Sequence, residues 1–365
     1  MRKTLIILTI LLTSVVSFSQ KEGSITRIVK AYDSTSIVAF GESHDQIEIL
    51  EYYKTLVSDK SFQEKVDDIV LELGNSFYQE ILDKYISGQN VPYEEVRNVW
   101  FSATNSLLQF GDYGYVEILI KHIREVNLNL PKNNQFRVIA ADPPVNWNVI
   151  KSPSDFWPFL GRRDLHFATT IWNEVIDKKR NAFVIMGRRH LLRHDPKPVN
   201  YVSLVDILES RLGEKIFIIR AEIDKEIGEI PLIKNINNTT LSENLVFKNF
   251  ELKYKESVDA IIYFKTWSTL PIEPFTDNKD IKELNKRSLA VHKSKFQFNS
   301  YDYLHYLIKK KGIEGVVVFE NLVKVNKSLI DYNEQLVNIL ANDIDDIAIK
   351  NKILQMVKEL NKVKK

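Results

Sequence analysis

The sequence has no cysteine among its 365 residues and little net charge. The missing thiols exclude disulfide bonds, thiolate metal sites, a cysteine nucleophile and a lipoprotein anchor. A formal net charge of +2 gives no reason to expect nucleic acid or an anionic membrane surface as a partner. The Gly-x-Ser-x-Gly elbow, the P-loop and the dinucleotide-binding fingerprint are also missing. The chemistry must therefore be sought in other side chains.

The composition is that of a soluble protein able to bury a core, with 44% hydrophobic and 27% charged residues. The length allows one large domain or two ordinary ones. An aromatic content of 11% suits packed cores or an apolar pocket.

The N-terminus has the pattern of a signal peptide. Arg2 and Lys3 precede an apolar run from Thr4 to Val16, and Ser17-Phe18-Ser19 supplies small residues for cleavage before Gln20. The run is too short to span a bilayer comfortably, although an uncleaved anchor is the alternative. We expect an exported protein, periplasmic or secreted, with no integral membrane span after cleavage. The lack of disulfides favours a bacterial envelope.

The most informative stretch runs from Ser36 to His44. Its apolar, β-rich residues end at Gly41, and Glu42 and His44 follow at once. Apolar residues then recur at helical spacing, at Ile47, Leu50, Tyr53 and Val57. This order predicts a strand, a tight turn that holds Glu42 and His44, and a helix. Open α/β sheets place their chemistry in such loops.

A second copy of this pattern covers residues 182–190. The apolar run from Ala182 to Met186 meets Gly187, and His190 follows three residues later. Further strands are expected at 69–74, 136–141, 216–219 and 260–264, and helices at 24–32, 77–86, 92–126, 162–178 and 202–212. We expect Phe77, Ile81 and Tyr85 to share one face of their helix. In the helix at 162–178 we expect an inward face of Leu165, Ala168, Ile171, Trp172 and Val175. The alternation predicts an α/β fold with a mainly parallel sheet flanked by helices.

The composition changes after Trp267. Residues 271–286 are polar and contain proline, and only helical patterning follows Asn299. We therefore expect a signal peptide at 1–19, an α/β domain at 20–267, a linker or excursion at 268–298 and a small all-α region at 299–365. Those helices form either degenerate tetratricopeptide-like hairpins or an ordinary helical cap.

Glu42 beside His44 suggests a general base that activates water, since a carboxylate can fix the tautomer of the ring and raise its basicity. Alternatively, Glu42 caps the next helix and His44 is a surface residue. Glu72 closes an apolar strand, where a carboxylate needs a partner. His190 could act as a second acid or base.

Several neighbours could contact a substrate, and Arg188, Arg189 and Arg193 could bind its carboxylate or phosphate group. Arg188 and Arg189 precede His190, and Arg163 and His166 open the helix before the second copy. Asp142 ends the strand at 136–141, although it also suits a turn before Pro143. Asp164 can be explained by the helix dipole alone. A metal site at His44, Glu72 and His190 has only weak support, because no tight His-x-x-x-His cluster exists.

These motifs resemble the Tiki/erythromycin esterase/ChaN superfamily. Its members share strands ending in Gly-Glu-x-His, in glutamate and in Gly-x-x-His, which here are Gly41-Glu42-Ser43-His44, Leu71-Glu72 and Gly187-Arg188-Arg189-His190. The segment from Arg163 to Ala168 is similar to the Arg-Asp-x-x-Met-Ala segment of the esterase and ChaN branches, with Phe167 replacing methionine. The Ala140-Ala141-Asp142 strand end resembles a Gly-x-Asp. The resemblance covers roughly residues 24–264.

The resemblance implies different activities in different branches. The esterase branch implies ester or macrolactone hydrolysis, with His44 as base, Glu72 orienting it and His190 with an arginine at the oxyanion. The Tiki branch implies a metal-dependent protease, and the ChaN branch implies haem or iron binding at the envelope.

We predict an exported hydrolase that cleaves an ester, lactone or amide. The sequence does not decide whether it uses no cofactor, a divalent metal or haem. A haem- or iron-binding protein is the first alternative. The second is an interaction protein whose C-terminal helices bind a protein partner. The predicted catalytic residues are His44, Glu42, Glu72 and His190, and the predicted substrate-binding residues are Arg188, Arg189, Arg163, His166 and Asp142.

Overall fold

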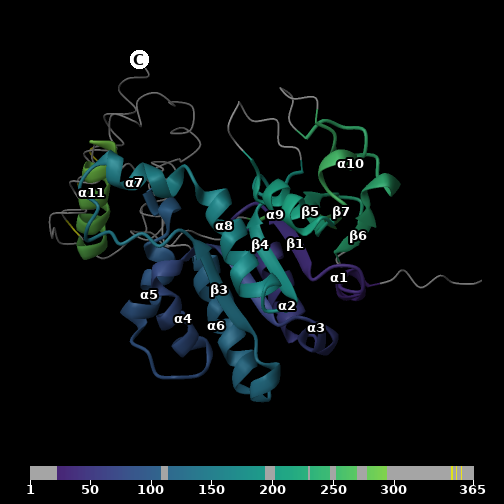
Figure 1. The fold of residues 1–365 in the computed structure, drawn as a ribbon, viewed down its shortest axis with the longest axis horizontal. Coiled ribbons are helices and arrows are strands. Elements are labelled where there is room, and N and C mark those ends of the chain that lie inside the picture. The colour runs from purple at the N-terminus through teal and green to yellow at the C-terminus, as the bar shows by residue number, and fades with distance from the viewer. Residues whose placement is uncertain are drawn as a thin grey trace, which may run out of the picture.

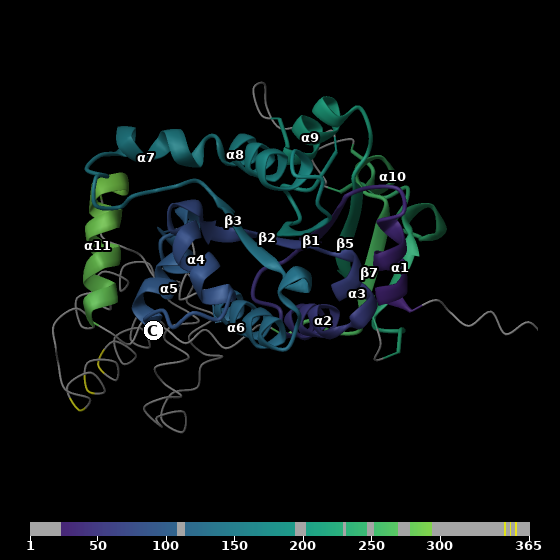
Figure 2. The ribbon, with the colours of Figure 1, turned by 60° about the horizontal axis from the view of Figure 1, so that its bottom comes forward.

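The chain folds into a seven-stranded β-sheet covered by helices on both faces (Figures 1 and 2). The computed structural model describes residues 23–107, 114–193, 202–228, 231–246, 252–268 and 278–293, with positions 347, 351 and 355. The strands are β1 (Ile37–Glu42), β2 (Asp68–Asn75), β3 (Arg137–Asp142), β4 (Ala182–Gly187), β5 (Phe217–Ile223), β6 (Leu232–Asn235) and β7 (Ala260–Phe264).

The strand order is β3-β2-β4-β1-β5-β7-β6, and every pairing is parallel except that of β6 with β7. The predicted α/β fold class is therefore confirmed. The edge strand β6 was not predicted, because its four residues, Leu-Ile-Lys-Asn, are too few to show a period.

Strand residues alternate between two apolar layers. Val38 and Phe40 of β1 face the first layer, which contains α1 to α6, whereas Ile37 and Ala39 face the second, which contains α8 and α9. Figure 2 shows α2, α3 and α6 on one side of the sheet and α7, α8 and α9 on the other. Burial on both faces explains why these strands are apolar throughout.

Most helices of the first layer lie in the predicted segments, but α3 was not predicted and the segment expected at 92–126 forms two helices, α5 and α6. They are α1 (Ser24–Ala31), α2 (Ile47–Ser58), α3 (Lys60–Lys65), α4 (Gln79–Ile86), α5 (Tyr93–Phe101) and α6 (Gly114–Leu128), with short 3₁₀ turns η1 (Ser76–Tyr78), η2 (Thr104–Leu107) and η3 (Lys132–Asn134). Of the three residues expected on one face, Ile81 and Tyr85 of α4 pack against the core, whereas Phe77 lies in η1. Phe77 is 50% exposed, and Leu82 and Ile86 are the buried residues, because η1 turns the chain before α4 begins.

The second layer differs more from expectation. It contains α7 (Pro153–Leu160), α8 (Arg163–Ile171), the π-helical turn η4 (Trp172–Ile176), α9 (Leu204–Leu212) and α10 (Tyr254–Ser257), with the 3₁₀ turn η5 (Ile236–Asn238) after β6. Leu165 was expected to point inward but is 52% exposed. Arg163 and Asp164 are buried instead, which turns α8 so that Phe167 enters the core and Leu165 faces outward.

The segment expected as a linker or excursion contains a helix, α11 (Asn278–His292), beside α7 (Figures 1 and 2). Arg97 of α5 pairs with Asp280 at 2.8 Å, and the buried Arg287 donates to the Phe101 carbonyl at 2.9 Å. The predicted signal peptide lies outside the described residues. So do the predicted C-terminal helices, apart from three single positions. In the described part of the chain, no helix combines the length and apolarity needed to cross a membrane.

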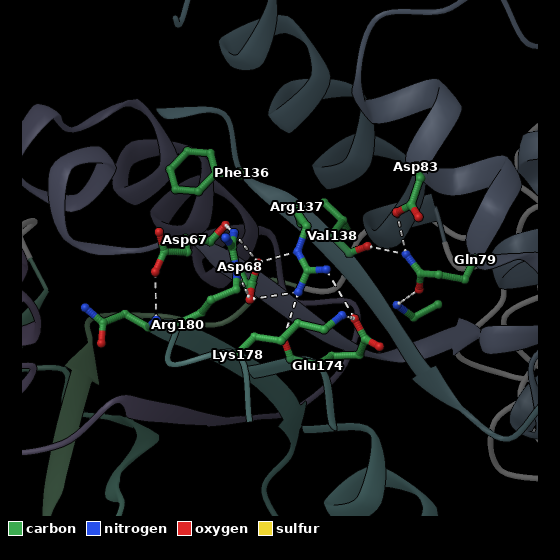
Figure 3. Close-up of polar contacts among 12 residues, drawn as sticks. Asp67, Asp68, Gln79, Asp83, Phe136, Arg137, Val138, Glu174, Lys178 and Arg180 are labelled. Carbon is green, nitrogen blue, oxygen red and sulfur yellow. Dashed lines mark hydrogen bonds and ion pairs between the residues drawn. The ribbon is translucent and has the colours of Figure 1, made fainter. Parts of the chain in front are cut away.

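A polar network ties the amino ends of β2 and β3 together (Figure 3). Asp68 is completely buried and accepts hydrogen bonds from Arg137 at 2.9 Å and from Arg180 at 2.8 Å. Arg137 also reaches Glu174, and Asp67 accepts from the Asn181 backbone N–H. This network lies at the opposite edge of the sheet from the Gly-x-x-His turns.

Candidate functional site at the carboxyl edge of the sheet

Three sequence motifs meet at the carboxyl ends of adjacent strands. Glu42 is the last residue of β1 rather than part of the turn, Glu72 lies in β2, and His190 follows β4 by three residues. Because β4 lies between β2 and β1, these residues come together although more than a hundred positions separate His190 from the two glutamates. His44 lies in the turn before α2, where Asp45 has a left-handed φ of 63°. Aspartate tolerates that conformation better than most residues.

His44 is held through its Nδ1 atom. That nitrogen lies 3.0 Å from Glu42 Oε1, and the carboxylate also accepts hydrogen bonds from the hydroxyls of Tyr115 at 3.0 Å and Tyr53 at 2.9 Å. The other ring nitrogen, Nε2, lies 3.7 Å from Glu72 Oε2, beyond ordinary hydrogen-bond distance. Glu42 therefore orients the ring, and Nε2 is the atom left to exchange a proton.

His190 repeats this arrangement with different partners. Its Nδ1 atom lies 3.0 Å from both carboxylate oxygens of Asp164, and its Nε2 atom lies 3.4 Å from Glu72 Oε1. The backbone N–H of Leu204 also donates to Asp164, at 3.1 Å. Two carboxylate–imidazole pairs thus direct their Nε2 atoms at the same buried glutamate.

Glu72 is fixed by donors on both of its oxygens. The Gly187 N–H donates to Oε2 at 2.5 Å, while Arg163 donates to Oε1 at 3.0 Å and Asn105 lies 3.4 Å from the same oxygen. Arg163 is itself held by Asp142, at 3.0 Å from its Nε atom. The side chain of Glu72 is only 2% exposed, so it has little freedom to move.

Carboxylates raise the pKa values of the two histidines, and the histidines with Arg163 lower the pKa of Glu72. Burial opposes ionisation of both histidines, but Glu72, together with Glu42 for His44 and Asp164 for His190, raises each pKa to about 9. Burial likewise acts against the Glu72 carboxylate, but the two histidines and Arg163 hold its pKa well below the ordinary range. At neutral pH the resting site therefore contains an ionised Glu72 between two protonated imidazoles.

Gly187 is needed because the site is packed against its backbone. A Cβ atom at this position would lie 3.0 Å from Glu72 Oε2 and 3.2 Å from His44 Nε2. The glycine of the second Gly-x-x-His motif thus lets β4 approach both groups, and its N–H can bind the carboxylate.

The predicted substrate-binding residues do not form one group. Asp142 is completely buried and accepts from the Thr104 backbone and hydroxyl, so it reaches the site only through Arg163. The expectation that Asp142 binds substrate directly is therefore wrong, because it has no exposed surface. Arg163 is equally engaged, between Asp142 and Glu72. Both are positioning residues.

His166 lies apart from the two paired histidines. It is 3.2 Å from Ser76 Oγ, and burial lowers its pKa. It lines a pocket of ≈ 360 Å³. The other lining residues include Pro143, Pro158, Phe159, Arg162 and Leu165. Arg189 is exposed, and Arg188 is half-buried with its guanidinium carbon 6.0 Å from the ring centre of Trp267.

The sequence analysis missed several hydrogen-bond partners of the two histidines and of Glu42 and Glu72. Asp164 was given a helix-dipole explanation, although its place in the Arg-Asp segment was a usable signal. Tyr53 was recognised only as part of a helix face. Tyr115 and Asn105 had no local signal, because their contacts span 71 and 33 positions of the chain.

The donor set does not fit a metal ion. The Nδ1–carboxylate pairs leave the Nε2 atoms as potential ligands, but Arg163 lies 3.0 Å from the Glu72 oxygen that also faces His190, where a cation would be repelled. No cluster of three or more histidine and carboxylate side chains suited to a metal is found in the described part of the chain. We therefore derive no step through a metal.

Comparisons with known proteins leave the family open. No protein-family model matches the sequence, and no curated protein matches it. A solved structure of a Bacillus cereus protein is similar at a TM-score of 0.40 with 13% identity, covering 66% of this chain and 90% of that one. The type III effector HopBA1 is similar at a TM-score of 0.37 with 10% identity, covering 67% of this chain and 94% of that one.

Proposed function

We propose that the chain is an exported hydrolase of the erythromycin esterase/Tiki type, which uses water to cleave an ester, lactone or amide. The observation that carries the proposal is the pair of imidazoles whose Nδ1 atoms are held by Glu42 and Asp164 and whose Nε2 atoms face Glu72. Such pairs hold a ring in one tautomer and leave the other nitrogen to move a proton. Export rests on the N-terminal sequence pattern.

The reaction needs one histidine as base and the other as a cation. Neutral His44 donates its Nδ1–H to Glu42 and takes a proton from water at Nε2, while the water oxygen bonds to the carbonyl carbon. The electron pair of the C=O bond moves to the carbonyl oxygen, and protonated His190 donates a hydrogen bond to that oxyanion. When the C–O or C–N bond breaks, the leaving group takes the proton from His44. An acid and an alcohol or amine are released, and His44 is neutral again.

Glu72 is a positioning residue in this scheme. Its low pKa keeps it ionised, so it is a poor base at neutral pH. Both Nε2 atoms face its carboxylate, which favours the protonated state of His190. Protonated His190 in turn stabilises the oxyanion.

The haem- or iron-binding alternative would use the same histidines as ligands. Haem iron is held by the unprotonated nitrogen of an axial imidazole. Both rings have a pKa of about 9, so at neutral pH their Nε2 atoms are protonated, which supports the hydrolase over haem ligation. The interaction-protein alternative depends on residues 299–365, nearly all of which lie outside the described residues.

The direct test is turnover of a panel of small esters, lactones and amides by the mature protein. We expect His44→Ala to lose about 10²- to 10⁴-fold in kcat/KM, the usual contribution of a general base. His122→Ala is the matched control, since His122 on α6 bonds to Ser58 and the Lys54 carbonyl, outside the cluster. A chelator should have no effect.

Three outcomes would count against the proposal. Full activity in His44→Ala would remove its central residue. Turnover lost to a chelator would favour the metal-dependent branch. A Soret shift on haem titration, with no turnover of any substrate, would favour haem binding.

A further inference from the structure

Outside the histidine cluster, a buried arginine in the middle of β5 has an unused donor. Arg220 is 5% exposed and its Nε atom donates to Glu222 Oε1 at 2.7 Å. Its Nη1 atom is buried and has no hydrogen-bond partner in the structure as described. A guanidinium stays charged in proteins, so a buried N–H without an acceptor is costly unless a ligand supplies one.

A second arginine follows β4, which only β1 separates from β5 in the sheet. Arg188 directly follows β4, and no carboxylate of the described residues lies within ion-pair distance of it. Gly41 pairs in register with Arg220, and a Cβ atom on Gly41 would lie 3.1 Å from the Arg188 Cα atom. Because Gly41 has no side chain, the backbone of Arg188 can approach Gly41 of β1 closely. Gly41 is also the residue that pairs with Arg220 on β5.

Tyr254 contacts Arg220 and lies within electrostatic range of Arg188. The Arg220 guanidinium carbon lies 4.8 Å from its ring centre, and its hydroxyl donates to Glu222 at 2.8 Å. Burial raises the pKa of Tyr254 to about 12, while the charges of Arg220 and Arg188 oppose that rise. Both guanidinium groups therefore act on the same hydroxyl.

The balance of charge here is opposite to that of the histidine cluster. Arg220 pairs with one carboxylate, Glu222, whereas Arg188 has no carboxylate partner among the described residues. Trp267, beside Arg188, adds a buried Nε1–H that has no partner among the described residues. Unused donors and an uncompensated positive charge are what an oxygen anion would satisfy.

We propose that Arg188 and Arg220 form a subsite for a carboxylate or phosphate group. The inference rests on the proposed function in one respect: it names the substrate class as an ester, lactone or amide that carries such an anionic group. The planar fork of each guanidinium matches two oxygens of either group. Of these two arginines, the sequence-based expectation included Arg188 but not Arg220.

The test is calorimetric titration of the whole mature chain with inorganic phosphate and with acetate, using chloride to hold the ionic strength constant. We expect one of the two anions to bind in preference to chloride. Arg188→Gln and Arg220→Lys should each weaken that binding about tenfold, the usual effect of losing a charge-assisted hydrogen bond. Arg220→Lys keeps the charge next to Glu222, which protects the fold.

Arg211→Gln is the matched control, because Arg211 also lies over a tryptophan, with its guanidinium carbon 3.6 Å from the Trp172 ring centre. It should bind the anion like wild type. Tighter binding of acetate would assign the site to a carboxylate, and tighter binding of phosphate to a phosphoryl group. Equal responses to all three anions, or unchanged binding in both site variants, would overturn the inference. Binding is measured without turnover, so a protein that binds the anion but cleaves no ester refutes only the proposed hydrolysis.

Discussion

His44 and His190 differ from ordinary histidines because three carboxylates surround them. Each ring has one nitrogen fixed by its own carboxylate, and both second nitrogens face Glu72. The site also includes Asp142, which pairs with Arg163. The carboxylates of the site therefore outnumber its one permanent cation, Arg163, and protonated histidines offset part of the excess negative charge. The same residues thus supply the proposed chemistry and bind protons unusually tightly.

This tight proton binding should make stability depend on pH. Both pKa values rise from an ordinary 6.5 to about 9 on folding. The stabilisation is fully present below pH 6.5 and is lost as the pH rises through 9. We expect the free energy of unfolding to fall over this range, by up to about 3 kcal/mol for each histidine. Chemical denaturation between pH 6 and 10 measures it. The His44→Gln/His190→Gln double variant should give a flatter curve, and an equally steep one would contradict the assignment.

Gly187 offers a test of how closely the site is packed. In Gly187→Ala the new methyl group would press on the Glu72 carboxylate and on His44. We expect a loss of at least about tenfold in kcat/KM and about 1–3 kcal/mol of stability, as overpacking usually costs. Gly114→Ala is the control, since a Cβ atom there meets nothing within 4 Å. Unchanged activity in Gly187→Ala would mean that Glu72 and His44 need not keep these positions.

At the level of residues, the sequence pointed to Glu42, His44, Glu72 and His190 because each follows or ends an apolar run. The partners that set their chemistry were harder to find. Tyr115 meets His44 only once α6 packs beside α2, and that packing leaves no mark near either residue.

At the level of elements, the repeated strand–Gly-x-x-His unit predicted two strands that end in one site. Their adjacency as β4 and β1 could not be read from the pattern, because strand order depends on how the helices cross over. The inward face of α8 was mispredicted for a related reason. Buried ion pairs of Arg163 and Asp164, rather than apolar periodicity alone, set its rotation.

The Asp68 network offers a stability test at the other end of the strands. Asp68→Asn leaves Arg137 and Arg180 facing a neutral amide (Figure 3). We expect a loss of about 2 kcal/mol, less than for a fully buried pair, because the arginine side chains are 36% and 29% exposed. Thermal and chemical denaturation measure it. Activity of the folded variant should stay at the wild-type level, and a large fall in kcat would show that the two edges are coupled.

At the level of the whole molecule, the sheet separates two kinds of polar cluster. The amino edge carries the ion pairs of Asp68, which join strands, whereas the carboxyl edge carries the paired histidines and the two arginines near Gly41. Helix α11, although distant in sequence, contacts α7 and the turn η2, which supplies Asn105 to the site. Composition alone suggested a linker there, because polar residues dominate a helix that buries few side chains.

The most direct measurement is the pH dependence of kcat/KM for the best ester of the panel, from pH 5 to 10, in wild type and His44→Ala. The account predicts a bell-shaped profile with its maximum near pH 9, since the reactive state has one histidine neutral and the other protonated, and both have a pKa of about 9. His44→Ala should lose the ascending limb together with most of the activity. A wild-type maximum near pH 6.5, or a profile that His44→Ala leaves unchanged, would contradict a catalytic role for this pair.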